Sequence, residues 1–305
     1  MRTLLLDTDI GSDVDDHLAL ALALLHPELE VAAVTTLGSD PARGAAMARE
    51  LLRLAGRGEI PVHAGEARAL LRPERFGPIR LAGPDEPVSD LPSSEPAPEA
   101  IARLAAERPG LELVAIGPLT NLARALALDP ELPRRVARLT VMGGHIRDVR
   151  IGSASMRPGI DYNLCADPEA TVAVLGAGFD TTLVTADVTL RVWMREAEVE
   201  ALAAAVPLGR HLAERIRRWT PQQRRIFTDL GGELAPDNAA FLHDPLTVVA
   251  LVEPAGLRFE EIGVLPTVAE GVLRTLESPL GPRMRVATDV DPEAARDAIL
   301  RRLLP

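Results

Sequence analysis

The first residues able to do chemistry are aspartates wedged between two apolar runs. The chain opens MRTLLLDTDIGSDVDDHLALALAL, and five aspartates fall within ten positions: Asp7, Asp9, Asp13, Asp15 and Asp16. A helix N-terminus offers partial positive charge and free N–H groups, which neutralise one or two carboxylates but not five. A hard divalent cation with oxygen ligands, Ca²⁺ or Mg²⁺, accounts for the remainder. The structural alternative is that these aspartates only cap the helix or carry solvated charge in a loop. A cluster of five directly after a buried strand favours a functional site.

Two reaction classes begin with an Asp-x-Asp pattern after a first strand. One is an aspartyl-phosphate phosphatase with Asp7 as nucleophile, but Gly11 stands where that pattern needs Thr or Val. That chemistry usually recruits a lysine as well, and all 33 basic residues of this chain are arginine, which would have to substitute. The other class is metal-assisted hydrolysis, in which one aspartate is the general base for a metal-bound water.

The elements that must position these aspartates follow an alternating pattern. An apolar run at residues 3–6 predicts a buried strand, and residues 14–25 predict a helix with Asp13 as N-cap. Further strands are expected at residues 30–36, 61–64, 111–116, 139–142 and 181–185, and further helices at residues 41–54, 99–107, 120–128 and 168–175. This alternation predicts an α/β fold with an open, mostly parallel sheet flanked by helices. Ligands of such sheets bind at the carboxyl ends of the strands, where the aspartates stand.

The remaining segments are less regular. Residues 66–98 are rich in Pro, Gly and charge and are interpreted as a long loop or lid, and residues 143–165 as an irregular stretch. From about residue 195 the pattern becomes mainly helical. The helices expected there are 196–205, 208–219, 245–251 and 292–304, with short strands near 258–264 and 283–288. Because no linker or repeat interrupts the chain, we expect a single domain over residues 1–305.

Composition limits the partners. The net charge is −11 with a pI near 5.1, which argues against nucleic acid or an anionic membrane as the main partner. A single cysteine, Cys165, excludes an intrachain disulfide and fits a reducing cytoplasm. No signal sequence and no apolar run of membrane-spanning length is recognisable, so a cytoplasmic location is expected.

Five motifs occur in the order found in one known family. They are DTDIGSDVDDHLAL at 7–20, AIGPLTNLARAL at 115–126, VMGG at 141–144, DYNLCADPEA at 161–170 and HDPLTVVA at 243–250. Together they resemble the nucleoside hydrolases, the inosine-uridine-preferring N-ribohydrolases, over nearly the whole chain. The resemblance implies a Rossmann-like core, a small-molecule nucleoside as substrate and hydrolysis of ribonucleosides to ribose and free base.

The resemblance also implies a metal site. A single Ca²⁺ would be held by the side chains of Asp9, Asp16 and Asp244 and by the main-chain carbonyl of Ile116. Asp9 would in addition be the general base for the metal-bound water. Positive oxocarbenium character develops on the ribose during cleavage, and a carboxylate-rich pocket favours that charge.

Substrate contacts are implied by the same resemblance. Asp15 would hold ribose hydroxyls, Asp161 and Asn163 would face the 5′ end of the sugar, and Met142 would line the pocket. His243 would protonate the leaving base, as the matching histidine does in some members. The alternative for His243 is that it caps or orients the helix that starts at Pro245.

The chain departs from the family pattern at several positions. The opening motif is two residues longer than the commonest form, so Asp13 is an extra residue with no chemistry beyond a cap. After the second strand, Gly38-Ser39-Asp40 replaces the usual Gly-Asn, so Ser39 or Asp40 is the candidate for that ribose contact. A relative that binds nucleosides or ribose without turnover therefore stays open. The resemblance further implies a homodimer or homotetramer.

Overall fold

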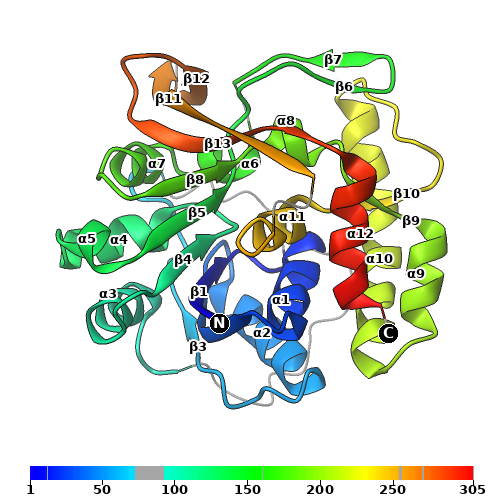
Figure 1. The fold of residues 1–305 in the computed structure, drawn as a ribbon, viewed down its shortest axis with the longest axis horizontal. Helices are drawn as coiled ribbons and strands as arrows, with labels where there is room; N and C mark the ends of the chain where they lie inside the picture. The colour runs from blue at the N-terminus through cyan, green and yellow to red at the C-terminus, as the bar shows by residue number, and fades with distance from the viewer. Residues whose placement is uncertain (12, 73–92, 160, 254–255, 270, 305) are drawn as a thin grey trace.

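A nine-stranded sheet organises the chain, in the order β12-β11-β13-β8-β5-β4-β1-β2-β3 (Figure 1). The computed structural model describes all residues except 12, 73–92, 160, 254–255, 270 and 305. The strands from β13 to β3 run parallel: β1 (Arg2–Thr8), β2 (Leu29–Thr36), β3 (Val62–Ala64), β4 (Glu112–Ala115), β5 (Arg138–Met142), β8 (Thr181–Val184) and β13 (Arg283–Val290). β11 (Leu257–Ala269) and β12 (Val272–Glu277) extend one edge antiparallel.

Both faces of the sheet are covered, which is why the strands read as continuous apolar runs. In β1, Leu4 and Leu6 pack into one hydrophobic cluster and Leu5 packs into the other. On one side lie α1 (Asp15–Leu25), α2 (Pro41–Leu54), α11 (His243–Val249) and α12 (Pro292–Leu303) (Figure 1). On the other side lie α3 (Ala97–Glu107), α4 (Thr120–Leu128), α5 (Leu132–Arg135) and α7 (Pro168–Leu175). The predicted fold class is confirmed.

Smaller elements differ from expectation. The stretch interpreted as irregular contains a hairpin of β6 (Val149–Ile151) and β7 (Ala154–Met156) and the short helix α6 (Tyr162–Ala166). The strand β12 was not expected, nor was the ribbon of β9 (Trp193–Arg195) with β10 (Asn238–Phe241). Strands this short give too little alternation to be recognised. Most of the expected lid, residues 73–92, lies outside the described residues.

Helix boundaries shift where tertiary contacts decide them. After α8 (Ala186–Thr189) and α9 (Glu196–Ala203), α10 (Pro207–Asp229) continues through Pro221, beyond the end expected at residue 219. Its buried face runs on past the proline to Gln223, whose side chain binds β10. At the N-terminus of α1 the cap residue is Val14, and Asp13 instead accepts a hydrogen bond from the amide of Asp15.

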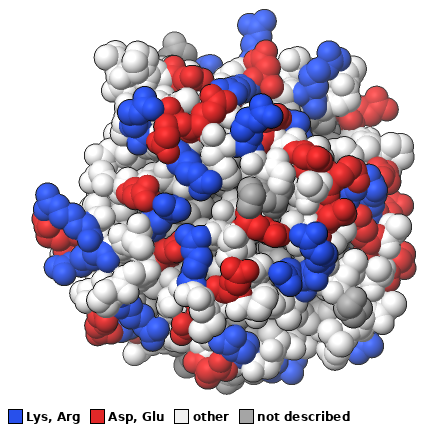
Figure 2. Space-filling model, viewed as in Figure 1, with Lys and Arg blue, Asp and Glu red and all other residues white. Residues whose placement is uncertain are grey.

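Charged side chains are interleaved on the surface. Figure 2 shows arginines and acidic residues mixed over the face viewed. Many of them pair, as Arg103 does with Glu95 and Glu107. In the part of the chain that the structure describes, no helix has both the length and the apolar character needed to cross a membrane.

Candidate active site

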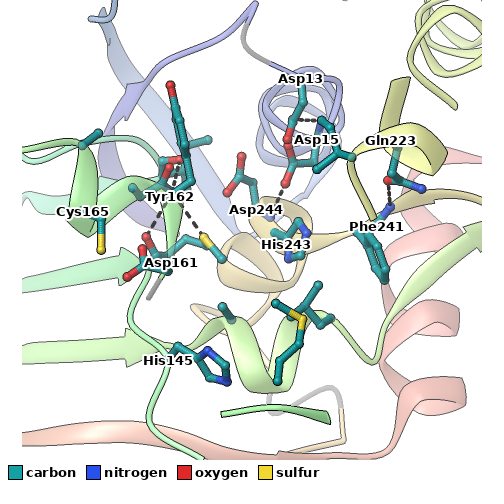
Figure 3. Close-up of a pocket in the computed structure, with 18 of the residues that line it drawn as sticks. Asp13, Asp15, His145, Asp161, Tyr162, Cys165, Gln223, Phe241, His243 and Asp244 are labelled. Carbon is teal, nitrogen blue, oxygen red and sulfur yellow. Dashed lines mark hydrogen bonds between the residues drawn. The ribbon is translucent and has the colours of Figure 1, made fainter. Parts of the chain in front are cut away.

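A pocket of about 770 Å³ opens at the carboxyl ends of the central strands. The residues that follow β1, β4 and β8 line it, as does the last residue of β5: these are Asp9, Ile116, Ala186 and Met142. The N-termini of α1 and α11 close one side, and α10 and β10 contribute the wall opposite α6 (Figure 3). This is the position at which parallel α/β sheets bind their ligands.

An acidic cluster forms one side of the pocket. Carboxylate oxygens of Asp13, Asp15 and Asp16 lie within 4.8 Å of one another. Asp244 joins them from α11, because its backbone N–H donates to Asp15 Oδ2 at 3.3 Å across a sequence separation of 229 residues (Figure 3). Asp9 follows β1 and lines the same pocket. The fold thus brings the opening motif and the late His-Asp-Pro motif together, and it adds Asp13, for which no role beyond a helix cap was predicted.

The cluster carries more negative charge than its surroundings can solvate. Asp16 and Asp244 are 2% and 3% exposed. Burial, and then the charges of neighbouring aspartates that include Asp9, raise the pKa of both carboxyls well above the usual range. A bound cation would relieve this repulsion. The available donors are all oxygens, from the carboxylates and the Ile116 carbonyl, so the residues present fit a hard divalent cation.

Asp7 lies behind the pocket and does not line it. It is 1% exposed, and its Oδ1 accepts hydrogen bonds from Asn121 Nδ2 at 2.8 Å and Thr35 Oγ1 at 2.6 Å. Burial raises the pKa of Asp7 to about 7. A residue held in this way is not placed to attack a substrate in the pocket, so the phosphatase alternative has no structural support.

Asn121 is a structural residue that sequence reasoning missed. Its amide donates to the carbonyl of Thr36 at 3.2 Å in addition to Asp7, and its Oδ1 accepts from the amide of Glu66 at 2.9 Å. The sequence predicts for it only a place in the helix at 120–128. It instead ties the ends of β1 and β2 to the segment after β3, and no local pattern signals contacts so distant in sequence.

The side of the pocket near α6 offers polar groups. Asp161, Asn163 and Met142 line it, as the resemblance implied. Asn163 Nδ2 donates to the carbonyl of Ile116 at 2.9 Å, which orients that possible ligand. Asp161 Oδ1 caps α6 by accepting from Leu164 N, whereas its Oδ2 is buried with no partner among the described residues. Burial raises the pKa of Asp161 to about 6. That oxygen is available to a hydroxyl of a ligand.

Ser39 and Asp40 are not among the residues that line the pocket. Both are exposed, and Asp40 Oδ1 accepts from the amide of Arg43 as the N-cap of α2. Asp187 Oδ1 accepts a hydrogen bond from the amide of Ile146 at 2.9 Å. Its helix, α8, has Thr185 as the N-cap residue.

The wall opposite Asp161 is apolar and aromatic, and Figure 3 shows Phe241 on that side. It is lined by Trp219, Ile226, Phe227, Leu230 and Phe241. The ring centroids of Phe227 and Phe241 are 5.0 Å apart and the ring planes are tilted by 50°. The face of either ring could stack on a flat heterocycle. Gln223 also lies here, but both ends of its amide are engaged, with Asn238 Oδ1 and with the amide of Phe241. Gln222 and Arg225 of the same helix do not line the pocket.

His243 stands between the acidic cluster and the aromatic wall (Figure 3). It is the first residue of α11, is half-buried and lines the pocket. Its Nδ1 lies 2.6 Å from Thr189 Oγ1, and its ring centroid is 5.2 Å from that of Phe241. Burial lowers the pKa of His243 to about 4, so the ring is neutral at neutral pH.

Gly117 makes the approach of Asp9 to β4 possible. A Cβ at residue 117 would stand 2.6 Å from Asp9 Oδ1 and 2.9 Å from Asp9 N. If Asp9 is the general base that the resemblance implies, Gly117→Ala should displace it and lower kcat/KM by about 100-fold, the effect of misplacing a reacting group by about 1 Å. Gly58→Ala is the matched control, because a Cβ there meets nothing within 4 Å. Steady-state kinetics of both variants test this, and an unimpaired Gly117→Ala enzyme would contradict it.

Comparisons with known proteins agree with this arrangement. Residues 4–297 match the family model described as inosine-uridine preferring nucleoside hydrolase. The chain is 33% identical to the pyrimidine-specific ribonucleoside hydrolase RihA of a Shewanella species, over 83% of this chain and 79% of that protein. It is 29% identical to an Arabidopsis thaliana protein named probable uridine nucleosidase 2, over 99% and 98%.

Solved structures give the same result. A plant nucleoside hydrolase superposes with a TM-score of 0.85 at 29% identity, covering 99% of both chains. A purine-preferring ribonucleoside hydrolase from Gardnerella vaginalis superposes with a TM-score of 0.80 at 25% identity, covering 99% of this chain and 98% of that one.

Proposed function

Because this chain belongs to the inosine-uridine preferring nucleoside hydrolase family and is a hydrolase of N-glycosyl bonds in ribonucleosides, we propose a mechanism for it in which Ca²⁺ is the cofactor, Asp9 is the general base and His243 assists the leaving base. Asp9, Asp16, Asp244 and the carbonyl of Ile116 are the proposed ligands.

The observation that carries the proposal is the buried acidic cluster. Its carboxyls lie together with little exposure, and the pKa values of Asp16 and Asp244 are raised by burial and mutual repulsion. Ca²⁺ accepts six to eight oxygen ligands in flexible geometry, which suits a site built from aspartates and a carbonyl. When bound, Ca²⁺ orients the nucleophilic water and the ribose hydroxyls and lowers the pKa of that water modestly.

The chemistry at the sugar uses the chain's own groups. The water oxygen bonds to C1′ while the C1′–N bond breaks and its electron pair stays on the base nitrogen. Asp9 accepts one proton from the water and later releases it to solvent. His243 is neutral, so it donates a hydrogen bond from its ring N–H to the departing base and keeps its proton, and the base nitrogen takes its proton from solvent. The negative cluster favours the oxocarbenium charge of the transition state.

Substrate orientation follows from the three sides of the pocket. With the ribose hydroxyls at Asp15 beside the acidic cluster, the base extends to the aromatic wall and the 5′ end faces Asp161 and Asn163. Met142 lies under the sugar between these sides. We propose stacking on Phe227 and Phe241 as the main contact with the base.

A ribose-release assay across purine and pyrimidine nucleosides tests the proposal. We expect hydrolysis of at least one common ribonucleoside, which stops in the presence of a chelator and returns with Ca²⁺. Tight nucleoside binding without release of ribose would instead identify a binding relative. The proposed homodimer or homotetramer is measured on the same preparation by light scattering coupled to size-exclusion chromatography.

A further inference from the structure

A buried hydroxyl behind the base end of the pocket has no role in the proposed reaction. Thr189 is the last residue of α8, is 0% exposed, and places Oγ1 at 2.6 Å from His243 Nδ1. We propose that Thr189 is a positioning residue that keeps the proton of His243 on Nε2, directed at the departing base. The inference rests on the proposed function, because it concerns its leaving-group step.

The hydrogen-bond lengths indicate where the hydroxyl proton goes. Oγ1 of Thr189 has two possible acceptors, His243 Nδ1 at 2.6 Å and the carbonyl oxygen of Ala186 at 3.4 Å. Hydroxyl hydrogen bonds to oxygen are normally about 2.5–3.0 Å long, so the Ala186 carbonyl is a poor acceptor and we assign the hydroxyl proton to Nδ1. A neutral imidazole has one N–H and one bare nitrogen. If Nδ1 accepts from Thr189, the ring proton is on Nε2.

The surroundings leave Nε2 as the nitrogen that faces the ligand. The ring lines the pocket, and its other nitrogen is taken by Thr189. Phe241 packs against it at 5.2 Å with an interplanar angle of 35°, which restricts rotation of the ring. The backbone of His243 is fixed at the start of α11, beside Asp244. Packing restricts the plane of the ring but does not select a tautomer or distinguish the two flipped ring orientations. The hydrogen bond from Thr189 does both.

The tautomer matters because the base departs with the electron pair of the broken bond. A donor at Nε2 stabilises the developing negative charge on the base nitrogen, whereas a bare Nε2 would repel it. A leaving group that is stable as an anion needs no such donor. The effect of Thr189 should therefore depend on the leaving group, which a purely structural role does not predict.

Two ribosides with different leaving groups provide the test. We expect Thr189→Val, which keeps the side-chain shape, to lower kcat for inosine and uridine by at least about tenfold. With 4-nitrophenyl β-D-ribofuranoside, kcat should stay within about twofold of the parent enzyme. Thr189→Ser should restore nucleoside hydrolysis, since it keeps the hydroxyl. In a His243→Ala background, Thr189→Val should add no further loss.

Matched controls separate positioning from stability. Thr185→Val removes a hydroxyl that is equally buried at the N-terminus of the same helix but donates to the Ala287 carbonyl, so both substrates should respond alike. Equal losses on both ribosides with Thr189→Val, or no loss on nucleosides, would overturn the proposal.

A measurement on the unmodified enzyme does not depend on any variant folding. Nitrogen-15 NMR of the histidine rings should report the Nε2–H tautomer for His243, and an Nδ1–H tautomer would refute the role of Thr189. If the unmodified enzyme hydrolyses no riboside, the proposed function fails, while the tautomer still tests the geometry around Thr189.

Discussion

Asp9→Asn should reduce kcat/KM for every nucleoside by at least about 10³-fold, because it removes both a general base and a cation ligand. Asn has nearly the shape of Asp, so the loss would reflect charge rather than packing. The substitution also removes a charge that raises the pKa of Asp16 and of Asp244. The unfolding midpoint without cation should therefore be no lower than that of the parent enzyme. Steady-state kinetics and thermal unfolding measured together test both statements.

Asp13→Asn is the matched comparison within the same cluster. Asp13 is half-buried at the edge of the pocket, and its Oδ1 accepts the hydrogen bond from the Asp15 amide. An asparagine oxygen can accept the same bond, so we expect activity within about tenfold of the parent enzyme, as for the loss of a neighbouring charge near the site. Equal damage from Asp13→Asn and Asp9→Asn would contradict the proposed ligand set. It would favour a cation held by the close trio of Asp13, Asp15 and Asp16.

Removal of the cation should have the second large effect. We expect exhaustive chelation to abolish ribose release and Ca²⁺ to restore it. Binding to the folded state alone stabilises it by about 2.7 kcal/mol at a free concentration 100 times Kd. The unfolding midpoint should therefore rise by several degrees with Ca²⁺. In Asp16→Asn this shift should shrink or vanish, whereas Gly58→Ala should keep it. If the unfolding midpoint of the parent enzyme does not change when Ca²⁺ is added, Ca²⁺ does not bind to the folded protein.

The size of this Ca²⁺ effect should depend on pH. In the metal-free protein the pKa values of Asp16 and Asp244 are raised above 3.8, so these two carboxyls bind more protons in the folded state than in the unfolded chain. Their contribution to the stability of the metal-free protein therefore falls as pH rises above 3.8. A cation replaces those protons, so the difference between midpoints with and without Ca²⁺ should widen with pH. A constant difference over that range would show that these carboxyls do not hold the ion.

Local sequence predicted the central fold well. The runs that became β1 to β5 and β8 are apolar on both faces, and most are separated by helical segments, a pattern that only a covered parallel sheet satisfies. The predicted bounds of helices and strands were less accurate where an element is short or is extended by tertiary contacts. The helix expected to end at residue 219 is α10, which continues through Pro221 because Gln223 beyond it is bound to β10. Propensity acts on a few neighbouring residues and cannot register such a contact.

The sequence by itself determined the chemistry that this protein has at hand: aspartates at the end of a buried strand, no lysine, and an ordered set of motifs that resembles one hydrolase family. Only the tertiary structure decided which groups meet. In the folded chain Asp244 hydrogen-bonds to Asp15, and Thr189 lies beside His243. Asp7 is held outside the pocket by Asn121, and Asp40 caps a helix. Periodicity and composition report how each segment buries its own side chains. The partner of a side chain depends instead on how strands order in the sheet and where helices pack, which is fixed by the free energy of the whole fold.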